Sequence, residues 1–164
     1  MTETIDVFLN PGDFRFAAAG TRLHTLLGSC VAITVWHPQR RIGGMCHYLL
    51  PSRQAGAEGA GLDGRFADDA VALFRREVDR HGTHPGEYEV KVFGGADQFP
   101  HIAGPLTGVA GRNAGAALDL LARNGFRVDA CQVGGHGSRR IVFDLNTGHV
   151  WLRSLQLFDD QVSA

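Results

Sequence analysis

The sequence has no long apolar run, no excess of positive charge and an odd number of cysteines. Each of these features argues against one class of protein. Its longest unbroken apolar stretch lies around residues 31–36, far short of the ~20 residues that a membrane-spanning helix needs. Lysine and arginine total 16 against 17 aspartates and glutamates, for a formal net charge of −1. We therefore expect neither membrane insertion nor a nucleic-acid partner, which would call for a basic surface.

The N-terminal residues and the number of cysteines indicate the cellular compartment of the protein. Residues 1–6 are acidic and polar, whereas a secretory signal is basic and then apolar, so we expect a cytoplasmic protein. The cysteines Cys30, Cys46 and Cys131 are odd in number, which favours reduced thiols over a disulfide framework. One of them is a candidate reactive thiol.

Glycine is abundant, with 22 in 164 residues, and it is paired at 43–44, 94–95 and 134–135, each time beside a β-like run. Paired glycines let the backbone turn sharply or approach another group closely. The length fits one domain without an evident linker, so we predict a single domain over residues 1–164.

Hydrophobic periodicity predicts a mixture of strands and helices. Strands are expected at 31–36, 42–50, 88–93, 126–133, 139–145 and 149–155, the first two as a hairpin. One helix is expected from Asp63, with apolar residues every fourth position from Phe66 to Val78, and another is expected to be capped by Asn113 and closed by Gly125. Residues 52–62 are predicted to form a loop that could serve as a lid. The pattern indicates an α+β layered fold with largely antiparallel pairing.

The hairpin suggests where chemistry could occur. Taken alone, Cys30 after Gly28 and Ser29 is more typical of a small buried thiol than of a nucleophile. A turn at 37–41, however, pairs Cys30 with Tyr48, and a shorter turn pairs it with His47, ~5 Å away at Cβ. A thiolate–imidazolium pair is then feasible, and it would supply both a nucleophile and a general acid.

A third polar group usually orients the imidazole of such a pair. Thr25 is a candidate, although a purely structural threonine fits equally well. A zinc site made of Cys30, Cys46 and His47 is disfavoured, because adjacent strand residues point to opposite faces.

Several separated motifs together resemble one family. They are residues 25–32 (TLLGSCVA), 43–51 (GGMCHYLLP), 65–67 (RFA), 91–96 (KVFGGA), 112–113 (RN) and 134–135 (GG) with Arg139 and Phe143. In this order the motifs resemble the CheD family of chemoreceptor glutamine deamidases, over residues ~5–155. Cys46 and Ser138 depart from the family pattern, which often has asparagine at the first position and glycine at the second.

The resemblance implies hydrolysis of glutamine side-chain amides to glutamate and ammonia on methyl-accepting chemotaxis receptors, with no metal or organic cofactor. It implies Cys30 as nucleophile, His47 as base and acid, and Thr25 as the third catalytic residue. The candidate substrate-binding residues are Gly28, Ser29, Phe93, Gly94 and Gly95. It also implies packed β-sheets flanked by helices, similar to bacterial toxin-type glutamine deamidases, and a CheC-type phosphatase as a further partner.

Two other functions compete with deamidation. A transglutaminase would use the same thioester but release it to an amine. A non-catalytic docking partner of the receptor or of a CheC-type phosphatase would need neither Cys30 nor His47.

Overall fold

The computed structural model describes residues 3–53, 61–97 and 108–155. Within these ranges the strands are β1 (Ile5–Phe8), β2 (Phe14–Ala18), β3 (Thr21–Leu27), β4 (Val31–His37), β5 (Ile42–Tyr48), β6 (Glu89–Gly94), β7 (Val128–Val133), β8 (Ser138–Asp144) and β9 (Val150–Leu155). The helices are α1 (Ala67–Arg80), α2 (Val109–Arg123) and the short 3-10 turn Pro85–Glu87. No described helix is long and apolar enough to cross a membrane.

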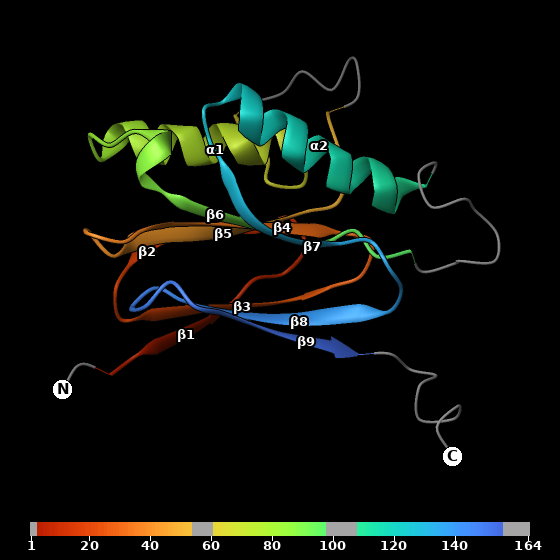
Figure 1. Ribbon diagram of the computed structural model, residues 1–164, viewed down its shortest axis with the longest axis horizontal. Coiled ribbons are helices and arrows are strands. Elements are labelled where there is room, and N and C mark those ends of the chain that lie inside the picture. Colours follow the sequence, from red (N-terminus) through yellow and green to blue (C-terminus); the bar gives the residue numbers. More distant parts are fainter. Residues whose placement is uncertain (1–2, 54–60, 98–107, 156–164) are drawn as a thin grey trace.

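The strands form two sheets that pack face to face. One has the order β1-β3-β8-β9 and the other the order β2-β5-β4-β6-β7. Both helices cover the outer face of the five-stranded sheet, so the molecule has three layers (Figure 1). The β1–β3 and β6–β7 pairs are parallel, and the other five pairs are antiparallel. The expected α+β layering is confirmed, with helices on one side of the sheets.

Helix α1 follows the predicted apolar period. Ala70, Phe74 and Val78 are fully buried because a four-residue spacing keeps side chains on one helix face. Acidic residues occupy the first turn, where they complement the helix dipole. The helix begins at Ala67 rather than at Asp63, and residues 54–60 of the expected lid loop lie outside the described ranges.

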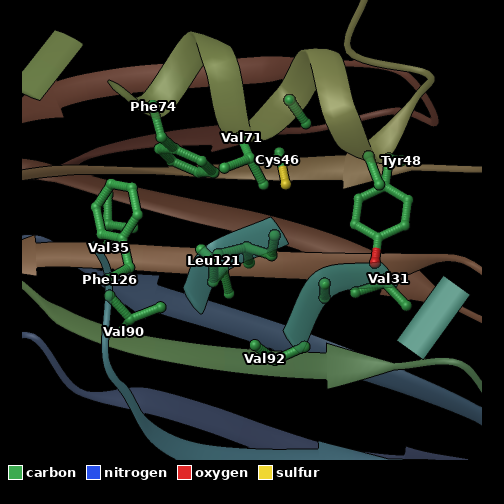
Figure 2. Close-up of a cluster of buried hydrophobic side chains, with 14 of the residues drawn as sticks. Val31, Val35, Cys46, Tyr48, Val71, Phe74, Val90, Val92, Leu121 and Phe126 are labelled. Atoms are coloured by element: carbon green, nitrogen blue, oxygen red, sulfur yellow. The ribbon is translucent and has the colours of Figure 1, made fainter. Parts of the chain in front are cut away.

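Two apolar clusters hold the layers together. The first lies between the helices and the five-stranded sheet and includes Val31, Val35 and Phe74 (Figure 2). The second lies between the two sheets and includes Ala32 and Ile141. Strand β4 therefore buries both of its faces, which explains its nearly continuous apolar sequence.

The sequence-based register of the hairpin was wrong by at least one residue. His37 pairs with Ile42, which places Val31 opposite Tyr48 and Ala32 opposite His47. The difference arises because β4 continues to His37 and the turn occupies only residues 38–41. Cys30 therefore precedes the strand instead of facing Tyr48 or His47.

The prediction that Asn113 caps α2 was also wrong. The helix begins one turn earlier, at Val109 with Gly108 as the N-cap residue, and Asn113 lies inside it, fully buried. Gly125 does follow the helix end, with a positive φ of 84°. Strands β1, β2 and β3 are additions to the sequence-based prediction. Strands β1 and β2 span only four and five residues, and in β3 a polar residue, Thr25, occupies the buried position between Leu23 and Leu27.

The outer face of the four-stranded sheet carries no helix among the described residues (Figure 1). Phe8, Leu26 and Trp151 are 68%, 51% and 53% exposed. Arg140 and Arg153 are direct cross-strand partners at the β8–β9 pair.

A matched leucine pair on α2 tests the layered core. Leu121 is fully buried, whereas Leu118 is 41% exposed. Leu121→Ala is expected to lower the free energy of unfolding by about 2–5 kcal/mol because it leaves a cavity, and Leu118→Ala by less than about 0.5 kcal/mol. Urea denaturation followed by circular dichroism measures both values; equal losses would contradict the packing of α2.

Candidate active site

The loop that carries Cys30 is held in place by hydrogen bonds that its main-chain carbonyl groups accept. The Cys30 carbonyl accepts a hydrogen bond from the Gly95 N–H at 2.9 Å, and the Gly28 carbonyl accepts one from the Ala96 N–H at 3.0 Å. The segment that follows β6 therefore fixes the backbone on both sides of Ser29. Cys30 itself is half-buried and packs against the cluster between the sheets.

Gly94 permits this close approach. Its φ is +110°, and a Cβ at this position would lie 2.2 Å from the Cys30 carbonyl oxygen. Only glycine satisfies both conditions without strain. The close approach of the backbone that paired glycines permit therefore occurs at Gly94.

Arg139 joins two of the glycine pairs. Its side chain is buried and donates hydrogen bonds to the carbonyls of Gly94, at 3.2 Å, and Gly134. Burial lowers the pKa of its guanidinium below the ordinary value. The loops after β6 and β7 are thereby locked to each other and to strand β8.

His47 and Thr25 meet across the interface between the two sheets. Thr25 Oγ1 lies 2.7 Å from His47 Nδ1, although one residue belongs to β3 and the other to β5. Both side chains are buried, at 5% and 2% exposure. The Thr25 hydroxyl also donates to the Leu9 carbonyl at 3.0 Å.

These contacts determine the histidine tautomer. The Thr25 hydroxyl has a single proton, and the Leu9 carbonyl can only accept it. Thr25 Oγ1 must then accept from His47, so Nδ1 carries the hydrogen. His47 Nε2 has no hydrogen-bond partner among the described residues. In the neutral ring this atom holds a free lone pair.

Cys30 and His47 share one face of the five-stranded sheet. His47 is directly opposite Ala32. Cys30 lies two residues before Ala32, just ahead of β4, and packs against the same cluster as Ala32, so Cys30 and His47 have the relation of diagonal neighbours. Such neighbours are roughly 7–8 Å apart at the backbone and closer at their side chains.

The local environment favours neutral forms of both groups. Burial lowers the pKa of His47 to about 4, a shift that the Asp13 carboxylate partly offsets. Burial also raises the pKa of the Cys30 thiol. A preformed thiolate–imidazolium pair, as the sequence suggested, is therefore not the resting state that these surroundings favour.

The other cysteines occupy different environments. Cys46 packs beneath the helices, on the face opposite His47, and burial raises its pKa to about 12. Cys131 is exposed on β7. Among the described residues no group of three potential ligands could hold a metal ion. Ser138, the second departure from the family pattern, begins β8.

The predicted substrate-binding residues are close to Cys30 in different ways. Phe93 is buried between the sheets. Gly94 and Gly95 are buried and contact the Cys30 carbonyl, Gly94 by its close approach and Gly95 through its N–H. Gly28 and Ser29 are half-buried in the loop itself. A direct contact of any of them with substrate stays a prediction.

The backbone of the loop offers hydrogen-bond donors. The N–H groups of Ser29 and Cys30 have no acceptor among the described residues, whereas the neighbouring carbonyls are all occupied. Free N–H groups beside a thiol are the arrangement that stabilises an oxyanion.

Sequence-based reasoning missed two contacts at this site. The Leu9 carbonyl belongs to the main chain, and no side chain marks it in the sequence. Asn113 was singled out as a helix cap and as part of the motif at 112–113, but its contacts were not predicted. Its amide instead donates to the Ser29 and Leu49 carbonyls.

Comparison with known proteins gives one consistent relationship. Residues 49–154 match the family model described as "CheD chemotactic sensory transduction". The chain is 46% identical over 161 residues to the probable chemoreceptor glutamine deamidase CheD 3 of Dechloromonas aromatica, which covers 98% of this chain and 94% of the relative. It is 50% identical over 152 residues to the probable chemoreceptor glutamine deamidase CheD of Pseudomonas fluorescens, with 92% and 85% covered.

Among solved structures, the hypothetical protein YfiH of Bacillus licheniformis aligns with 57% of this chain and 37% of its own, at 14% identity and a TM-score of 0.35. That likeness is too low to support any conclusion, and the expected similarity to toxin-type deamidases stays a prediction. The family model and the full-length relatives agree with the motif resemblance. The chain belongs to the CheD family.

Proposed function

We propose that this protein is a cysteine-dependent glutamine deamidase that converts selected glutamine side chains of chemotaxis receptors to glutamate. Relatives of nearly full length are named as probable chemoreceptor glutamine deamidases. The observation that carries the proposal is a half-buried thiol on the same side of the sheet as a histidine whose tautomer leaves Nε2 free.

In the first step, His47 Nε2 takes the Cys30 proton as the sulfur attacks the amide carbon of glutamine. The Ser29 and Cys30 N–H groups hydrogen-bond the oxygen that becomes negative. The His47 imidazolium then gives its proton to the amide nitrogen, the C–N bond breaks, and ammonia leaves. A thioester to Cys30 remains.

In the second step, His47 deprotonates a water molecule that attacks the thioester carbon. The C–S bond breaks, the proton returns to sulfur, and glutamate is released. A neutral resting pair suits this sequence, because the base must be unprotonated before each attack. The Asp13 carboxylate, which raises the pKa of His47 against desolvation, stabilises the imidazolium that forms in between.

Peptide mass spectrometry tests the activity directly. The purified protein is incubated with the cytoplasmic part of a chemoreceptor, and each glutamine is examined for the gain of ~1 Da that replaces NH2 by OH. We expect the gain with the wild type and with Cys131→Ala, whose thiol is exposed on β7, and no gain with Cys30→Ala.

The two competing functions give different results in the same experiment. Binding to the receptor without any mass gain would favour a docking role. A product that incorporates an added primary amine in preference to water would identify a transglutaminase.

The Thr25 hydroxyl is expected to matter through the tautomer of His47. Thr25→Val keeps the shape of the side chain but removes the hydroxyl, and kcat should fall about 10- to 100-fold, as for other groups that orient a functional histidine. Thr25→Ser should recover most of this loss. Thr34→Val, at a buried threonine of β4, is the control; an equal decrease there would contradict a specific role of Thr25.

The pH dependence of thiol alkylation distinguishes a neutral pair from an ion pair. Because burial raises the pKa of Cys30 and lowers that of His47 to about 4, little thiolate exists near neutral pH. The rate at which iodoacetamide modifies Cys30 should therefore rise about tenfold per pH unit from pH 6 to 8. Peptide mapping assigns the modification to Cys30, and a plateau across that range would show a preformed ion pair.

A further inference from the structure

Asn113 lies in the interior of a helix, and its buried side-chain amide donates hydrogen bonds to main-chain carbonyls outside that helix. It is fully buried in α2, and its Nδ2 donates to the Ser29 carbonyl at 3.1 Å and to the Leu49 carbonyl at 2.7 Å. The first carbonyl directly precedes Cys30, and the second lies two residues after His47. One side chain thus joins the two segments that carry the proposed nucleophile and base.

The backbone of Asn113 is held as well. Its carbonyl accepts a hydrogen bond from the Tyr48 hydroxyl, which extends from β5 through the cluster shown in Figure 2. Asn113 is therefore fixed from both its main chain and its side chain, and its Oδ1 has no hydrogen-bond partner among the described residues. Burial of an amide in this state opposes folding, so a function beyond packing is the simplest account of its presence.

The peptide plane between Ser29 and Cys30 links Asn113 to the chemistry. In a planar trans peptide the C=O and the N–H point in opposite directions. Asn113 holds the Ser29 carbonyl toward α2, which turns the Cys30 N–H away from the helix, on the side where the thiol packs against the cluster between the sheets.

We propose that Asn113 is a positioning residue that orients the Cys30 N–H to stabilise the oxyanion of the reaction. The inference rests on the proposed thioester chemistry and adds the group that aims its hydrogen-bond donor. Gly95 and Ala96 hold the carbonyls on either side, but neither acts on the peptide that contains the Cys30 N–H.

Two reagents separate this role from general support of the fold. Attack of Cys30 on p-nitrophenyl acetate forms a C–S bond and a tetrahedral oxyanion, which expels nitrophenolate while the thiol proton passes to His47. Alkylation by iodoacetamide displaces iodide at carbon and forms no oxyanion. Both reagents report on Cys30 without a receptor, and peptide mapping assigns each modification.

Asn113→Ala is expected to slow acylation of Cys30 about 10- to 100-fold, within the range for loss of oxyanion stabilisation, while alkylation changes less than threefold. With receptor as substrate, kcat should fall by a similar factor at nearly constant KM. Asn113→Gln, which retains the amide donor, should recover part of the rate. Asn124→Ala is the matched control, since Asn124 is the residue that caps the C-terminal end of α2. Among the described residues its side-chain amide donates to the Leu120 carbonyl and not to the loop that carries Cys30.

Equal losses in acylation and alkylation, or no loss in either, would overturn the proposal. If the alanine variant does not fold, Asn113→Asp keeps the size of the side chain without an amide donor. The rates of acylation and alkylation of Cys30 are then compared in that variant. Acylation of the wild type without receptor deamidation would refute the proposed substrate yet still decide the role of Asn113. Absence of both activities in the wild type would refute both proposals.

Discussion

The hydrogen bond between Thr25 and His47 is the contact on which the candidate site depends, because it crosses from one β-sheet to the other. Thr25 belongs to the four-stranded sheet and His47 to the five-stranded sheet. Its geometry therefore follows from the packing of Leu23, Leu27 and Ile141 against Ala32 and Met45 in the interface. The apolar layer that stabilises the fold also sets the tautomer of the histidine. A small shift of one sheet relative to the other would separate the pair while leaving both sheets intact.

Around that contact, the backbone does most of the positioning. The carbonyls of Gly28, Ser29 and Cys30 all bond to groups from elsewhere in the chain, and the Leu9 carbonyl receives the Thr25 hydroxyl. Carbonyls held in this way leave the N–H groups of the loop available to a substrate. The positively charged Arg139, buried among carbonyl oxygens, stabilises the adjoining loops without a carboxylate partner among the described residues.

Local patterns predicted the parts of the structure that depend on local periodicity. The β4–β5 hairpin and the apolar face of α1 could be read from the sequence because each buries a regular set of side chains. The register of the hairpin could not, because one residue more or less in the turn shifts every pair and the sequence at 37–41 allows several turn lengths.

The candidate site also has parts that the sequence predicted and parts that depend on tertiary packing. The hairpin argument gave the wrong register in both of its forms, and only the shorter turn placed Cys30 and His47 on one face. The structure puts both on the side of β4 and β5 that faces the second sheet, because Cys30 lies two residues before Ala32, which is opposite His47. The partner of Asn113 could not be predicted, since the amide contacts loops 64 and 84 residues away in sequence. The lowered pKa of His47 also depends on burial, and that burial comes from the packing of the two sheets.

The outer face of the four-stranded sheet, which no helix covers in the part of the chain that the structure describes, affects how the protein behaves in concentrated solution. Phe8 lies on the edge strand β1 and Trp151 on the edge strand β9, and exposed aromatic side chains on a sheet favour self-association. The cross-strand arginines Arg140 and Arg153 act against it, because two molecules that stack through this face bring four guanidinium groups together. Colloidal stability should therefore decrease as salt screens that repulsion.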